Sequence, residues 1–248
     1  MTAYIWGIVA GNHEVKAVYN FIKNYWGDWF PALPAYQNFN RRINFLAPAL
    51  QGLYALLVNE QEISPETVAH VLDSMPIIVA NSKRSGTAQS ANELCDKGYC
   101  ASKSMYYYGV KLHILGQKQY KTLPKTMMVD VSSASQSDIT VAKVWLSEVR
   151  NLDIFADKIY ADKSWRSVLA ERNVRMITPI KKKKGQDFLS AAEELFSTAV
   201  SRARQPIESF FSWLNRKTRI QSASLVRSAA GLVAFIFVRL SATFFFNS

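Results

Sequence analysis

The sequence contains few of the residues that stabilise small secreted folds or bind zinc. Of its 248 residues, two are cysteines and three are histidines. This excludes a disulfide framework, and the scattered histidines match no zinc-binding spacing. We interpret Cys95 and Cys100 as incidental thiols and expect a cytosolic protein, because structural disulfides are rare in the cytosol.

Long hydrophobic runs are also absent. A membrane-spanning helix needs roughly 18–20 apolar residues without charge. Here Arg239 interrupts the apolar stretch at 232–248, and Arg227 lies just upstream of it. The N-terminus has only a short apolar run and lacks the basic region of a secretory signal. We therefore predict that residues 226–248 form a helix or strand that packs on the core.

Negative charge is scarce in one part of the chain. Residues 163–219 have thirteen basic and five acidic side chains, whereas residues 1–72 have four basic and five acidic ones. The whole chain carries a formal net charge of +11. Such a concentrated basic block is typical of a surface that faces nucleic-acid phosphates, although a solvated basic face without a partner has the same composition.

Hydrophobic periodicity divides the chain into a helical N-terminal segment, 1–64, and a mixed α/β domain, 65–225. We expect Asn40 to cap a helix in the first segment.

Branched and aromatic runs in the second segment predict strands at 69–79, 104–116, 123–132, 157–162 and 174–180. Helices are predicted at 135–152, with Ser137 or Asp138 as its cap, at 163–173, and at 188–217, where Pro206 marks a break or a new first turn. This order predicts a mixed five-stranded sheet with flanking helices, antiparallel on one side and parallel on the other.

Three acidic residues form a candidate metal site. Asp73 lies in the first predicted strand and Asp162 ends the fourth. If these strands are parallel neighbours, about 4.8 Å apart, the two acids are adjacent, and a helix at the same edge would bring Glu208 to them. Carboxylates that converge without basic partners require cations, and hard oxygen ligands favour Mg²⁺ or Mn²⁺. Two such ions can carry out in-line phosphodiester displacement.

Each acid also has a simpler interpretation. Asp73 can cap a turn, Asp162 can cap the helix that follows it, and Glu208 can pair with Arg204 four residues earlier. Asp130 is a rival ligand because it too ends an apolar strand. As the third strand of the meander, however, that strand would place it roughly 10 Å from Asp73, which favours Asp162 as the partner.

Basic residues surround Glu208 and fill the loop that precedes its helix. We predict that they contact DNA phosphates. They are Arg202, Arg204, Arg216, Lys217 and Arg219 beside the glutamate, and Lys181, Lys182, Lys183 and Lys184 in the loop. The lysine run is equally compatible with a solubilising turn.

Four short blocks carry a resemblance to a known family: VLDSMPI with Asp73, YYYGVKLHI, IYADKSW with Asp162, and RQPIESFFSWLNRK with Arg204 and Glu208. Over residues 65–225 the sequence resembles bacterial insertion-sequence transposases of the DDE class. The resemblance implies an RNase H-like core in which Asp73, Asp162 and Glu208 bind two Mg²⁺ or Mn²⁺ ions. It also implies cleavage at the ends of the element and strand transfer into target DNA. The resemblance further implies a homodimer. It also implies a location at the nucleoid in the bacterial cytoplasm and no association with a membrane.

Two other functions stay open at this point. An RNase H-like nuclease would cut DNA without transposition, and inverted repeats in the flanking DNA would argue against it. A degenerate copy would bind DNA without cutting it. The helical segment 1–64, which is shorter than the corresponding region of related proteins, is compatible with such a copy.

Overall fold

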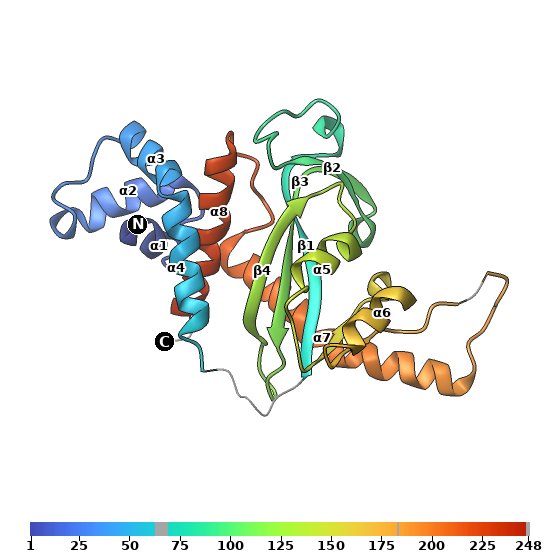
Figure 1. The fold of residues 1–248 in the computed structure, drawn as a ribbon. Helices are drawn as coiled ribbons and strands as arrows, with labels where there is room; N and C mark the ends of the chain where they lie inside the picture. The colour runs from blue at the N-terminus through green and yellow to red at the C-terminus, as the bar shows by residue number, and fades with distance from the viewer. Residues whose placement is uncertain (63–68, 183, 247–248) are drawn as a thin grey trace. The chain divides into compact units, whose positions relative to one another are not determined.

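The computed structural model describes residues 1–62, 69–182 and 184–246, which form two compact units (Figure 1). The first unit comprises Met1–Glu60, Pro76–Val110 and Trp213–Ser248, and the second comprises Gln61–Met75 and Lys111–Ser212. The predicted division at 64/65 and 225/226 stays a prediction, and its first boundary lies outside the described residues.

The first unit is mainly helical. Its helices are α1 (Thr2–Val9), α2 (Val15–Tyr25), α3 (Tyr36–Phe45), α4 (Ala47–Asn59) and α8 (Ala229–Ala242). Leu50, Tyr54 and Val58 recur every four residues on α4 and are all buried, because this spacing places them on one helix face. This unit contains the contact between α4 and α8, which lie side by side in Figure 1.

The apolar C-terminal segment, for which the sequence allowed helix or strand, is a helix. Ser228 begins α8 by accepting a hydrogen bond from the backbone N–H of Gly231 at 3.1 Å. The prediction that Asn40 caps a helix is wrong, since Asn40 lies inside α3 and the next helix begins at Ala47. None of the helices in the described part of the chain is long and apolar enough to span a membrane.

The described residues contain a six-stranded mixed sheet. Its strands are β1 (Ala69–Asn81), β2 (Asp96–Cys100), β3 (Met105–Gln117), β4 (Lys125–Ser133), β5 (Leu152–Ala156) and β6 (Val174–Ile177). The strand order is β2-β3-β1-β5-β6, and β4 also pairs with β3. β2 is antiparallel to β3, whereas β1, β5 and β6 are parallel. The predicted fold class is therefore confirmed, with one strand more than expected because β2 forms within the polar loop.

The fourth predicted strand is misplaced. Residues 157–162 do not form a strand: β5 ends at Ala156, and Lys158–Tyr160 form a single turn of 3₁₀ helix. The Asp157 carboxylate accepts a hydrogen bond from the backbone N–H of Lys158 at 2.6 Å, which starts this turn and ends the strand. The parallel partner of β1 is thus the preceding run, Leu152–Ala156.

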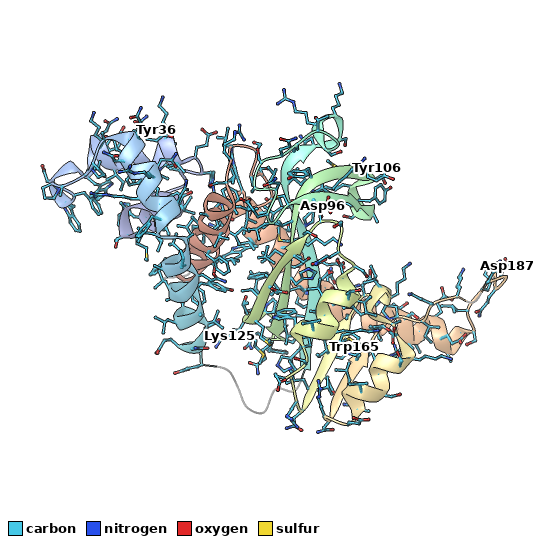
Figure 2. The ribbon with its side chains drawn as sticks, turned by 45° about the horizontal axis from the view of Figure 1, so that its top comes forward. Tyr36, Asp96, Tyr106, Lys125, Trp165 and Asp187 are labelled. Atoms are coloured by element: carbon cyan, nitrogen blue, oxygen red, sulfur yellow. The ribbon has the colours of Figure 1, made fainter. Side chains whose placement is uncertain are left out.

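The core of the second unit lies between the sheet and the helices α5 (Asp138–Trp145) and α6 (Lys163–Ala170). Leu72, Ile154, Tyr160 and Leu169 are fully buried there. Trp165 is 5% exposed and belongs to the same core (Figure 2).

The last helix that reaches the second unit is α7 (Ala191–Thr218), whose residues up to Ser212 belong to that unit. The prediction of a break or new start at Pro206 is wrong, because the helix continues through this residue. A proline inside a helix cannot donate to the carbonyl four residues earlier, so tertiary packing must compensate for the lost hydrogen bond. Buried Val200, Ile207 and Phe211 supply such packing along α7.

Candidate active site

The parallel pairing of β1 with β5 brings two aspartates together. Leu72 pairs with Ala156 in this register, so the residues that follow them, Asp73 and Asp157, lie next to each other. Neighbouring strands are about 4.8 Å apart. Asp73 lies within β1, and Asp157 is the first residue beyond the carboxyl end of β5.

One arginine of α7 connects these aspartates with a third carboxylate. The Nη2 atom of Arg204 is 3.1 Å from Oδ2 of Asp73 and 3.8 Å from Oε1 of Glu208, one helical turn further along α7. Its Nη1 atom is 3.7 Å from Oδ1 of Asp157. We call Asp73, Asp157, Glu208 and Arg204 the acidic cluster. Three carboxylates from three elements thus converge on one guanidinium.

The electrostatics of Asp73 show how close these charges are. The pKa of Asp73 is raised to about 6, mainly by burial and to a smaller extent by the charges of Asp157 and Glu208. Arg204 and the backbone N–H of Ser74 oppose this effect by stabilising the carboxylate. The guanidinium of Arg204 therefore does not offset the combined effect of burial and the neighbouring acids on Asp73.

A second ion pair lies beside the acidic cluster. Oδ2 of Asp138 accepts a hydrogen bond from the Ser74 hydroxyl at 2.9 Å, and its Oδ1 accepts one from Nζ of Lys111 at 2.7 Å. Asp138 is the first residue of α5 and Ser137 is its N-cap residue, so Asp138 is an acid of the first turn. Asp138 thus has its own lysine as a counter-ion, whereas the three acids of the cluster share one arginine.

The structure does not bring Asp162 to the acidic cluster. Asp162 is the N-cap of α6, and its Oδ1 accepts hydrogen bonds from the Trp165 N–H at 2.8 Å and the Ser164 hydroxyl at 2.7 Å. Its Oδ2 is 3.1 Å from Nζ of Lys143. The Trp165 N–H, followed by these side chains, lowers the pKa of Asp162. The expectation that Asp162 lies beside Asp73 is therefore wrong, and Asp157 takes that place.

The sequence did contain a signal for Asp157. It directly follows LDIFA, an apolar strand-forming run, whereas Asp162 follows a mixed segment and precedes the helical pattern KSWRSVLA. An aspartate directly before a helix is the usual N-cap pattern. Asp130 lies in β4, which pairs with β3, and β3 in turn is the neighbour of β1, so two strand steps separate Asp130 from Asp73.

The predicted DNA contacts fall into three groups. Arg204 is 8% exposed and belongs to the acidic cluster, so it is not a surface residue. Arg202 is exposed and lines a hollow of about 420 Å³ together with Glu208. The remaining described residues of the prediction are also exposed: Lys181, Lys182 and Lys184 in the second unit, and Arg216, Lys217 and Arg219 in the first.

Lys182 connects the lysine loop to the segment before α7 by a hydrogen bond and by the position of its ammonium group 5.8 Å from the centre of the Phe188 ring. The ammonium group of Lys182 donates a hydrogen bond at 2.6 Å to the backbone carbonyl of Asp187, a residue at the loop before α7 (Figure 2). Lys183 lies outside the described residues.

The donor chemistry of the acidic cluster fits a hard divalent cation. Asp73, Asp157 and Glu208 offer oxygen ligands only, and together they carry more negative charge than Arg204 neutralises. The geometry differs from a preformed metal centre, because the guanidinium lies among the carboxylates. Within the described ranges, no three His, Cys, Asp or Glu side chains are arranged as a ready metal-binding group.

Comparison with known proteins adds a family assignment for most of the chain. A family model described as "Transposase DDE domain" matches residues 64–245, which include the whole acidic cluster. Among curated proteins, no match was found.

Proposed function

Because the chain belongs to the transposase DDE domain family, we propose that it cleaves DNA at the ends of a mobile element and joins them to target DNA. The observation that carries this proposal is the convergence of Asp73, Asp157 and Glu208 within 3.8 Å of Arg204. Carboxylates gathered from two neighbouring strands and a helix are suited to metal-assisted phosphodiester chemistry.

We assign the catalytic roles to Asp73, Asp157 and Glu208, and not to the set with Asp162 that the sequence suggested. These three side chains would hold Mg²⁺ or Mn²⁺, with two ions as the expected number. When bound, the ions would acidify the attacking hydroxyl and stabilise the leaving oxygen. The three carboxylates would hold these ions in fixed positions, and the ions' positive charge would in turn orient the reacting phosphate.

Two successive displacements at phosphorus account for transposition. In the first, a water oxygen bonds to phosphorus while the bond from phosphorus to the 3′ oxygen breaks and that oxygen takes a proton. In the second, the freed 3′-hydroxyl loses its proton and its oxygen bonds to a phosphorus of the target DNA, while the bond from that phosphorus to the target's own 3′ oxygen breaks and that oxygen takes a proton. No covalent intermediate with the protein is required.

The exposed basic residues would bind the DNA backbone. Arg202 lies on the same helix as Glu208, six residues before it, and shares a hollow with it. This places a phosphate-binding charge next to the proposed ligand. We propose the same role for Lys181, Lys182, Lys184, Arg216, Lys217 and Arg219. Two element ends must be held together, so we propose a homodimer acting at the nucleoid.

The assignment of Asp157, and not Asp162, as a metal ligand can be tested directly with two variants. Asp157→Asn is expected to lower the Mg²⁺-dependent cleavage rate by at least about 100-fold, because loss of a metal ligand costs several kcal/mol of transition-state stabilisation. Asp162→Asn is the matched control: it is expected to stay within about fivefold of the wild-type rate and to melt a few degrees lower through loss of the cap. The substrate is DNA carrying the sequences that flank the gene.

The outcomes separate the competing functions. Loss of cleavage in Asp162→Asn with full activity in Asp157→Asn would refute the assignment and restore the set suggested by the sequence. Cleavage without joining to target DNA would identify a nuclease. Salt-sensitive DNA binding without cleavage by the wild type would identify a binding protein that lacks catalysis.

A further inference from the structure

Arg204 is placed among the carboxylates that the proposed function assigns to metal binding. Its side chain is 9% exposed, whereas Glu208 is 61% exposed. A buried guanidinium in a structural role uses its fork of N–H groups in several short, well-aligned hydrogen bonds. Arg204 makes one such bond in the described part of the chain, to Oδ2 of Asp73 at 3.1 Å.

The other contacts of Arg204 are loose. Its distances to Asp157 and Glu208, 3.7 and 3.8 Å, exceed those of a hydrogen bond. Its Nε atom is buried and finds no hydrogen-bond partner among the described residues. The guanidinium is therefore held mainly by charge. An ion pair of this kind can be replaced by a stronger cation more easily than a fully hydrogen-bonded one.

We propose that Arg204 is the internal counter-cation of the acidic cluster, which lies between the carboxylates in the metal-free protein and is displaced when a divalent cation binds. This inference rests on the proposed function, because it takes Asp73, Asp157 and Glu208 as the ligands. Mg²⁺ binds oxygen at about 2.0–2.1 Å. Since the terminal nitrogens of Arg204 together lie within 3.8 Å of one oxygen of each of these three carboxylates, the two cations compete for one space.

The alternative is a supporting role, in which Arg204 holds the carboxylates ready and stays in place when the metal binds. The two roles predict opposite effects on metal affinity. Removal of a competing positive charge tightens binding of a divalent cation, whereas removal of a support weakens it. Metal affinity can be measured without turnover.

The experiment measures Mn²⁺ binding to the full chain by electron paramagnetic resonance, together with thermal melting in EDTA. Arg204→Met is expected to bind Mn²⁺ at least about tenfold more tightly than the wild type. Without metal it is expected to melt at a lower temperature, because the acids then repel each other without compensation. The added Mn²⁺ should raise its melting temperature by more than it raises that of the wild type.

Two variants serve as controls. Arg150→Met removes the same charge from an exposed position of the second unit that belongs neither to the acidic cluster nor to the proposed DNA contacts, and it is expected to change Mn²⁺ affinity by less than about threefold. Arg204→Lys keeps the positive charge and is expected to remain near wild-type affinity. If Arg204→Met does not fold in EDTA, Arg204→Gln is measured in its place, with the same expectation of tighter binding.

Equal or weaker Mn²⁺ binding by folded Arg204→Met or Arg204→Gln would overturn the inference. Failure of the proposed function is recognised separately, through Asp157→Asn. If this variant binds Mn²⁺ as the wild type does, the ligand assignment itself is wrong. If it loses Mn²⁺ while removal of Arg204 brings no gain in affinity, only the role of Arg204 is refuted.

Discussion

At the scale of single residues, Asp73 combines burial with negative neighbours. Its side chain is 22% exposed and its pKa is raised from 3.8 to about 6. The folded state therefore holds a proton on Asp73 more tightly than the unfolded chain does. The stability that this proton contributes is fully present below about pH 4 and is lost as the pH rises through about 6.

This shift gives a prediction for the metal-free protein. The free energy of unfolding of the wild type, relative to that of Asp73→Asn, is expected to fall by up to about 3 kcal/mol between about pH 3 and 7, with a slope of at most about 1.4 kcal/mol per pH unit. Above pH 7 the difference is expected to be constant. Urea denaturation in EDTA across this range measures it, and a difference independent of pH would contradict the raised pKa.

The choice between Asp157 and Asp162 shows what the sequence could reveal about single residues. Both follow an alanine, and both lie near a strand-like run. The apolar run LDIFA before Asp157 favours it, but the pairing of Leu72 with Ala156 decides between the two, and a strand register depends on contacts across the fold. The burial of Arg204 depends on Asp73, 131 residues away, so no local pattern predicts it.

At the scale of elements, α8 is attached to the first unit by a buried arginine. Arg239 donates from Nε to the carbonyl of Thr218 at 3.0 Å and from Nη2 to the carbonyl of His13. Its guanidinium lies 3.4 Å from the centre of the Phe235 ring. One side chain thus joins α8 to the end of α7 and to the loop after α1. Arg239, which interrupts the apolar C-terminal stretch, therefore has a structural role in the first unit.

Arg239→Lys is expected to lower the free energy of unfolding by about 2–4 kcal/mol, because an ammonium group cannot donate in a planar fork to separate carbonyls. Arg227→Lys, a matched change at an exposed position, is expected to cost less than about 0.5 kcal/mol. Chemical denaturation of both variants measures the difference. Equal stability of the two would show that the hydrogen bonds of Arg239 contribute nothing net.

The sequence predicted correctly those helices and strands whose own residues favour the secondary structure that they adopt in the fold. β1, β3 and β4 have long branched or aromatic runs and formed close to the predicted positions. β2 was missed because DKGYC has polar, exposed residues and is held as a strand by pairing with β3. Pro206 lies inside α7 because tertiary packing outweighs its local preference to end a helix.

At the scale of the whole molecule, the net charge of +11 is concentrated in the block from 163 to 219. DNA binding is expected to weaken steeply with salt, because each bound phosphate releases counterions. Replacement of Lys181, Lys182 and Lys184 by alanine is expected to reduce the slope of log K against log salt by up to about 2.7, or about 0.9 for each phosphate that is no longer bound. Fluorescence anisotropy at several salt concentrations measures this slope.

The matched control replaces Lys16, Lys23 and Lys97, three exposed lysines outside the basic block. It removes the same net charge from the chain and is expected to leave the slope within about 1 of the wild-type value. Equal reductions in both triple variants would show that the lysine loop has no special part in binding. The net charge alone would then account for the affinity.

The contact between Asp73 and Arg204 also has a consequence for synthesis of the protein. The ribosome makes Asp73 first, then Asp157, and only much later the stretch that holds Arg204 and Glu208. A nascent chain that ends before residue 204 can already pair β1 with β5, but it then buries Asp73 without the arginine. Such a chain lacks the cation that stabilises the Asp73 carboxylate. Polypeptides that end before residue 204 would therefore lack both the arginine and the third carboxylate of the acidic cluster.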